Sequence, residues 1–159
     1  MSKHVREQVL DYVAQLLKEA TGVVDVKVHR IGPGQMHIAS RIEVYIDGET
    51  TGGSNSEDEF EDTLEASARI AALGVRITVK SDGYEHPHTT ANEILAQVEI
   101  AIATEEGTGD HEINGAQVSL QWAGIVSDDD DELDNEVVQL EVAYQASYRT
   151  PVGDPLTLI

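Results

Sequence analysis

The histidine pair His86 and His88 is the part of the sequence whose spacing best suits a metal ion. Pro87 lies between them and favours an extended backbone at the preceding residue, which can place both imidazoles on one side of the chain. Neutral imidazole is a good ligand for zinc or nickel, and Glu85 could supply an oxygen ligand. The segment also has the composition of a loop before a helix. We therefore favour an exposed loop here and keep a structural metal as the alternative.

Carboxylates alternate along the segment 127–136 in a way that suggests calcium binding. The alternating residues are Asp128, Asp130, Glu132 and Asp134. An EF-hand loop requires glycine at its sixth position and glutamate at its twelfth. Counted from Asp128, the sixth residue is Leu133, and a count begun one residue later also fails to give glycine. The segment is interpreted as a hydrated acidic loop, with loose binding of divalent ions as the alternative.

Motifs that identify common enzyme classes are missing from the sequence. It contains no G-x-x-x-x-G-K-[ST] or G-x-G-x-x-G phosphate-binding motif, no G-x-S-x-G nucleophile motif and no cysteine. The glycines of Ile31-Gly-Pro-Gly do not form a phosphate loop, because Pro33 lacks the amide N–H that such a loop would use. The six histidines, at positions 4, 29, 37, 86, 88 and 111, are scattered. The sequence therefore predicts a protein that is not an enzyme, with no catalytic residues, cofactor or resident metal.

The composition is strongly acidic. Thirty Asp and Glu residues face ten Lys and Arg residues, which gives a formal net charge of −20. Repulsion from DNA phosphates argues against nucleic-acid binding through a broad basic surface. Adaptation to high salt is the favoured interpretation, because salt screens the self-repulsion and carboxylates keep the surface hydrated. A functional negative surface and a simple solvated face are the alternatives. The first interpretation implies a halophilic source.

The length of 159 residues is typical of one domain. The first residues are charged and lack the apolar segment of a signal peptide. No run approaches the roughly 18 apolar residues that a membrane-spanning helix needs. Without cysteine, neither disulfides nor thiolate metal sites can form. We therefore expect a soluble intracellular product with no membrane association.

Two amphipathic helices are predicted. In residues 3–20, apolar side chains recur at helical spacing, and Thr21-Gly22 ends the pattern. The second helix covers about 90–104, where Thr90 and Glu93 have the spacing of a capping box. Each helix has one apolar face, which indicates that it packs against a sheet.

Alternation of apolar and polar side chains predicts the strands. The predicted strands are Val24–Arg30, Ile42–Asp47, about 60–80, Val118–Trp122 and Val137–Arg149. The segment 60–80 also has the Ala and Glu content of a helix, and one long strand with a bulge or bend at Gly74 is favoured. Long acidic loops are expected at 48–62 and 127–136. The aromatic residues are expected to pack the sheet, with a protein interface as the alternative: Tyr12, Tyr45, Trp122, Tyr144 and Tyr148.

These elements predict an α+β fold. A mostly antiparallel sheet of four to six strands carries two helices packed on one face. The whole chain, 1–159, forms a single domain with the two acidic loops emerging from it.

The order of these elements resembles that of the tail terminator proteins of long-tailed phages and viruses, the minor tail protein U family. The resemblance covers nearly the whole chain and consists of shared patterns rather than diagnostic motifs. The chain departs from the family in its very acidic 127–136 loop and its low content of basic residues. The matching features are helix 3–20, strands Val24–Arg30 and Ile42–Asp47, the long hairpin, helix 90–104, strand Val118–Trp122 and strand Val137–Arg149 with Tyr144 and Pro151.

The resemblance implies a structural role at the head-proximal end of a viral tail. Such proteins are made in the host cytoplasm and form a homohexameric ring on the tail tube. The ring stops addition of the major tail tube protein and presents a surface to the head completion or connector protein. Viral DNA would pass through the lumen without specific binding, and the acidic loops would lie at the ring contacts or the lumen.

Other functions are compatible with the sequence. A stopper or head completion protein would also form rings. An acidic DNA mimic would bind a basic nuclease or repressor and would not form rings. A divalent-ion-dependent binding module would change its stability when those ions are added.

Overall fold

The structure is a computed structural model that describes residues 2–29, 39–51, 66–129 and 137–159. These residues form two helices and six strands. The elements are α1 (Val5–Thr21), β1 (Asp25–Val28), β2 (Ser40–Thr51), β3 (Ala66–Lys80), α3 (Pro87–Ala103), β4 (Asp110–Ile113), β5 (Ala116–Asp129) and β6 (Val137–Pro151). No helix of the described part is long and apolar enough to cross a membrane.

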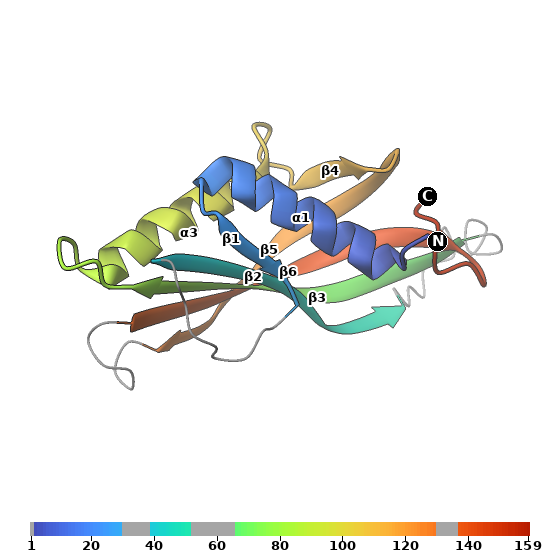
Figure 1. Ribbon diagram of the computed structural model, residues 1–159. Coiled ribbons are helices and arrows are strands. Elements are labelled where there is room, and N and C mark those ends of the chain that lie inside the picture. Colours follow the sequence, from blue (N-terminus) through green and yellow to red (C-terminus); the bar gives the residue numbers. More distant parts are fainter. Residues whose placement is uncertain (1, 30–38, 52–65, 130–136) are drawn as a thin grey trace.

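The strands form one sheet in the order β1-β2-β3-β6-β5-β4. Only the first pair, β1 with β2, is parallel; the other pairs are antiparallel. Both helices lie on the same face of this sheet (Figure 1). The predicted fold class is therefore confirmed, including the number of strands and the placement of the helices.

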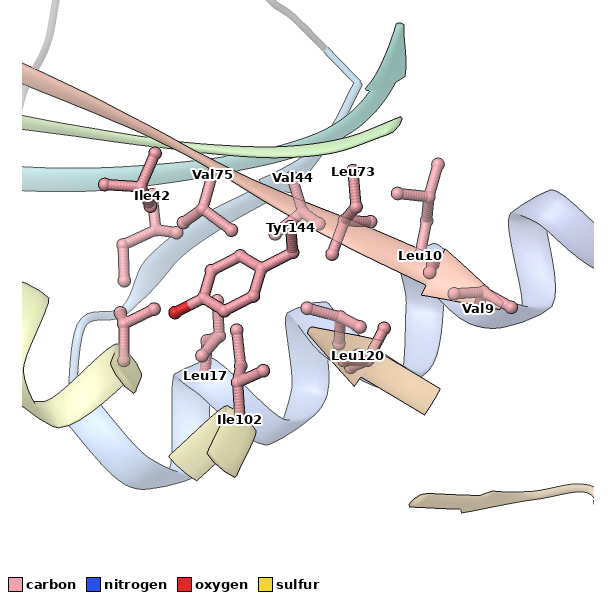
Figure 2. Packing of buried hydrophobic residues seen from close by; sticks show 14 of the residues in the cluster. Val9, Leu10, Leu17, Ile42, Val44, Leu73, Val75, Ile102, Leu120 and Tyr144 are labelled. Atoms are coloured by element: carbon pink, nitrogen blue, oxygen red, sulfur yellow. The ribbon is translucent and has the colours of Figure 1, made fainter. Parts of the chain in front are cut away.

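The hydrophobic core lies between the helices and the sheet. The apolar face of α1 contributes buried Val5, Val9, Val13 and Leu17, and α3 contributes a second apolar face. Figure 2 shows Tyr144 of β6 in this layer together with Leu17 and other core side chains. Because both helices are buried on one side, the period of apolar residues in the sequence is a direct consequence of this packing.

Strands β3 and β6 form the centre of the sheet. Their register is continuous over fifteen residues, from the pair Ala66 and Pro151 to the pair Lys80 and Val137. The predicted bulge at Gly74 is wrong, because Gly74 pairs in register with Ala143 and with Tyr45 on β2. The register shift lies on β2 instead, between Ile46 and Gly48.

The strands before the two predicted loops extend further than expected. Strand β2 continues to Thr51, so residues 48–51 of the predicted loop 48–62 pair with β3. Strand β5 continues to Asp129, so 127–129 of the predicted loop 127–136 pair with β6. The rest of both loops lies outside the described residues, as does the segment 30–38.

Helix α3 begins earlier than predicted. Its N-cap is His86, whose Nδ1 accepts a hydrogen bond from the His88 amide, and Pro87 occupies the first turn. The predicted capping box is wrong, because Thr90 lies inside the helix and its hydroxyl donates to Glu85. Proline is well suited to the first helical position, since its missing N–H has no partner there in any case.

The short strand β4 was not predicted. It forms a hairpin with β5 through Asn114 and Gly115, which both have positive φ (51° and 82°). An Asn-Gly pair between apolar residues is the strongest short-range signal for such a two-residue turn. The signal was therefore present in the sequence, although β4 itself has only four residues, too few for their alternation to identify a strand.

Candidate interaction surface

The histidine pair does not form a metal site with neighbouring residues in the described part of the chain. The rings of His86 and His88 are 6.5 Å apart, and His88 Nδ1 lies 3.0 Å from the Asn92 amide nitrogen. Among the described residues, no group of three or more His, Asp or Glu side chains could hold a metal ion. The two histidines instead begin helix α3. Most of the acidic segment 127–136, on which the calcium alternative depends, lies outside the described residues.

The aromatic residues divide into two classes. Tyr45, Tyr144 and Tyr148 are buried in the sheet, as predicted. Trp122 is 46% exposed, so the expectation that it packs within the sheet is only partly met. Its ring contacts the edge of the Tyr144 ring at a centroid distance of 5.5 Å. The chain's single tryptophan thus rests on the core with one side and faces outward with the other.

A groove of about 270 Å³ lies between helix α3 and strand β5. Its lining includes Glu99 and Ile102 from the helix and Leu120 and Trp122 from the strand. Tyr144 also lines the groove, and its hydroxyl is buried with no hydrogen-bond partner in the described structure. Burial, followed by the negative charge of Glu99, raises the pKa of Tyr144 well above its ordinary value, so the hydroxyl keeps its proton. The groove is therefore lined in part by a residue whose buried hydroxyl stays uncharged.

The outer edge of β5 is exposed beside this groove. Strand β4 covers only residues 116–119, and the Leu120 amide then donates to the Gly109 carbonyl. From Gln121 onward, no strand within the described ranges pairs with this edge. Ile125 and Val126 are 60% and 63% exposed. We call residues 121–126 the β5 edge.

The β5 edge lies in the longest stretch of the sequence without a charged side chain. Residues 113–127 contain no Asp, Glu, Lys or Arg, in a chain that is 25% charged. Strand β4, which covers the first part of β5, carries exposed Asp110 and Glu112. This stretch was not predicted to form a surface, although the interruption of charge is visible in the sequence. It becomes informative only when the structure shows that these apolar residues are exposed.

A buried polar cluster lies at the N-terminal end of helix α1. Glu49 accepts a hydrogen bond from the Tyr148 hydroxyl and lies 3.4 Å from Arg69 and 3.9 Å from Arg6. The register shift in β2 pairs Glu49 with the core residue Ala71 and so directs its carboxylate toward the helices. Burial and the bond to Glu49 raise the pKa of Tyr148. The cluster joins the helix to the sheet, which indicates a structural role.

The other face of the sheet carries ion pairs rather than helices. Arg41 Nε contacts Asp25 at 2.7 Å, and both side chains are largely buried. Arg76 lies 3.9 Å from Glu43 and 3.7 Å from Glu141 on the neighbouring strands. Cross-strand pairs of opposite charge stabilise a sheet. This face is therefore organised by charge, in contrast to the uncharged β5 edge.

No protein-family model and no curated protein sequence matches the chain. Solved structures with a similar arrangement of elements include the following two. One is a chain of the virion of a native gene transfer agent particle, with 12% identity, a TM-score of 0.47 and coverage of 92% of each chain. The other has 13% identity, a TM-score of 0.43 and coverage of 89% of this chain and 92% of that one. At these levels the likeness concerns the course of the backbone and carries no argument about function.

Proposed function

We propose that this chain is a structural protein of a virion that caps the tail tube as a ring. In this role it ends polymerisation of the tube and provides the surface that joins the head or connector. Capping of this kind makes and breaks no bond, since a head-to-tail interface closes on itself and covers the tube end. The whole chain acts as one tail-terminator-like domain at the head-proximal end of the tail.

The order of the elements is the observation that carries this proposal. The resemblance to tail terminators required an N-terminal helix, two strands, a long hairpin, a second helix and a closing pair of strands. The described residues contain the helices and strands in that order, with both helices on one face of the sheet, and β2 and β3 pair as the arms of the hairpin whose tip lies outside the described residues. The additional short strand β4 and the parallel pairing of β1 with β2 are compatible with that order.

The acidic composition supports two further parts of the proposal. Carboxylates facing the lumen repel the phosphates of passing DNA, so the DNA moves through the ring without specific binding. A net charge of −20 also suits a protein that works at high salt, as in a virus of a halophilic archaeon. We propose that the segments 48–62 and 127–136 lie at the lumen or at the contact surfaces of the ring.

The experiment that tests the proposal measures assembly and capping. Light scattering of the purified protein in molar and in low salt gives the mass of the assembly, and negative-stain images show whether it is a ring. The protein is then added to growing tail tubes of the same virus. We expect hexameric rings and tubes whose growth stops when the protein is present. Tubes that continue to grow at the normal rate would reject the capping role.

The same experiment separates the alternative functions. A stopper or head completion protein would form rings but leave tube growth unchanged. A DNA mimic would remain small and bind a basic protein instead of the tube. Deletion of 52–62 or 130–136 provides a further test, because tail length and head joining should change if those segments contact the tube or connector.

A further inference from the structure

We propose that the β5 edge, residues 121–126, is where one copy of this chain receives a strand of a second copy. The inference adds to the proposed ring by assigning the β5 edge to one side of the interface between its subunits. It rests on the proposed function only in requiring that copies of the chain associate.

The backbone of the β5 edge is available for pairing. Strand β4 ends its pairing at Ser119, and among the described residues Leu120 is the last whose amide is bonded on that side, to Gly109. Beyond it the described structure contains no further strand on this side. An unpaired edge presents a row of amide and carbonyl groups that another strand can complete.

The β5 edge exposes large apolar side chains, which are the kind that become buried when subunits associate. Trp122, Ile125 and Val126 are 46%, 60% and 63% exposed. Proteins usually protect an exposed edge with charged residues, and here the edge has none. The register shifts around Gly124 and between Ile125 and Ser127 increase the local twist. A twisted edge accepts a partner of matching shape, which favours a specific neighbour.

Charge identifies the partner as a second copy. Each copy carries −20, so two copies that meet through their acidic surfaces repel each other. The uncharged stretch 113–127 is the longest part of the sequence through which they can meet without opposing carboxylates. A basic partner protein would instead be drawn to the acidic surfaces and would gain little from an uncharged edge.

The groove beside the edge supports the same conclusion. A strand added to the β5 edge lies next to the groove between α3 and β5, which Trp122 lines. A strand added at this edge would cover the exposed side of Trp122 and close the groove against water.

The test compares Val126→Lys with Val152→Lys. Val152 is 62% exposed in the turn after β6, so the control introduces the same charge at the same residue type and exposure. Light scattering across a concentration series in molar KCl gives the midpoint of assembly, and circular dichroism confirms that each variant is folded. We expect Val126→Lys to raise the midpoint at least tenfold and Val152→Lys to leave it unchanged. Trp122 emission should shift to shorter wavelength as the wild-type protein assembles.

The outcomes of this test distinguish the proposal that the β5 edge is the interface from the proposal that the chain forms a ring. If Val126→Lys assembles like the wild type, or Trp122 emission does not change on assembly, the β5 edge is not the interface, although the ring can stand. If both variants impair assembly equally, the β5 edge is also not the interface, because the effect would then follow from the added charge alone. Dimers or open chains that Val126→Lys dissociates would support the edge and reject the closed ring. A wild-type protein that stays monomeric at all concentrations and salts overturns the β5 edge as an interface between copies in solution, and the effect on tube growth then decides the capping role separately.

Discussion

Tyr45 of β2 lies against the backbone of its register partner Gly74 on β3, on the sheet face away from the helices. Tyr45 is buried, and its ring occupies the space that a side chain at Gly74 would require. Arg76 completes the arrangement, with its guanidinium 5.9 Å from the centre of the Tyr45 ring. The glycine is therefore explained by the close approach of an aromatic ring across two strands.

A side chain at Gly74 should destabilise the protein. We expect Gly74→Ala to lower the free energy of unfolding by about 2 kcal/mol, the usual cost of overpacking. Urea denaturation measures this change. Gly48→Ala is the control, because nothing lies within 4 Å of the position of its Cβ. In a Tyr45→Leu background the cost of Gly74→Ala should fall below about 1 kcal/mol, since the ring that causes the clash is gone. An unchanged cost there would contradict the explanation.

The ion pair of Asp25 and Arg41 should make stability depend on acidic pH. Burial raises the pKa of Asp25, but the hydrogen bond and charge of Arg41, together with Lys27, outweigh it and hold the pKa below its usual value. A depressed pKa in the folded state stabilises the protein above the unfolded pKa of about 3.9, and this stabilisation is lost as pH falls through the folded pKa. We expect Asp25→Asn to cost about 2 kcal/mol at pH 7.

The pH dependence provides the check on this pair. The difference in unfolding free energy between the wild type and Asp25→Asn should shrink as pH is lowered below about 4. Glu93→Gln removes an exposed carboxylate from α3 and should stay within about 0.5 kcal/mol of the wild type. If the difference in unfolding free energy between the wild type and Asp25→Asn is constant between pH 7 and pH 3, the charge of this carboxylate does not contribute to stability.

The buried His111 should hold one tautomer. Its Nε2 lies 2.8 Å from the Ile102 carbonyl, which can only accept, so Nε2 carries the proton. Nδ1 then accepts from the Tyr12 hydroxyl at 2.9 Å. We expect Tyr12→Phe to lower stability by about 1–2 kcal/mol, because it leaves buried Nδ1 without a donor. Tyr84→Phe is the control, since Tyr84 is almost fully exposed. Nitrogen chemical shifts that place the proton on Nδ1 would refute the assignment.

Salt should stabilise the folded chain. The thirty carboxylates outnumber the ten basic residues, so the carboxylates repel one another, and more strongly in the compact state than in the unfolded chain. Added ions screen this repulsion. We expect the thermal midpoint to rise by about 5 °C between 0.1 M and 2 M KCl, which corresponds to roughly 1–2 kcal/mol for a domain of this size. Calorimetry at fixed protein concentration measures the shift. A midpoint that stays constant or falls would argue against adaptation to high salt.

Regular alternation made most of the sheet predictable. Strand β6 alternates buried and partly exposed residues over its whole length, and helix α1 buries one face at helical spacing. The period of the side chains is set by the backbone, so a sequence with one buried face reveals it directly. The ends of the strands were less predictable from the sequence. The extension of β2 and β5 depends on pairing with distant strands, which local pattern does not report.

The errors have identifiable physical causes. At α3 two start signals competed, and the cap at His86 with Pro87 prevailed over the pattern at Thr90 and Glu93. At Gly74 the sequence could not distinguish a bulge from close packing by Tyr45, since glycine serves both. The candidate surface at Trp122 was missed because alternation predicts burial, whereas helix α3 leaves this part of β5 uncovered.

The position of β6 in the sheet has a consequence for how the chain folds. It is the last strand in sequence order, yet it lies between β3 and β5 at the centre of the sheet. Its pairing with β3 joins residues that are far apart in sequence, such as Lys80 with Val137 and Ala66 with Pro151. Contacts of such long range slow folding, because the entropy of closing the loop is lost before the contacts form. During synthesis, the edges of β3 and β5 that pair with β6 in the folded protein therefore stay unpaired until β6 has been made. The high negative charge of the chain would keep these unpaired strands from aggregating.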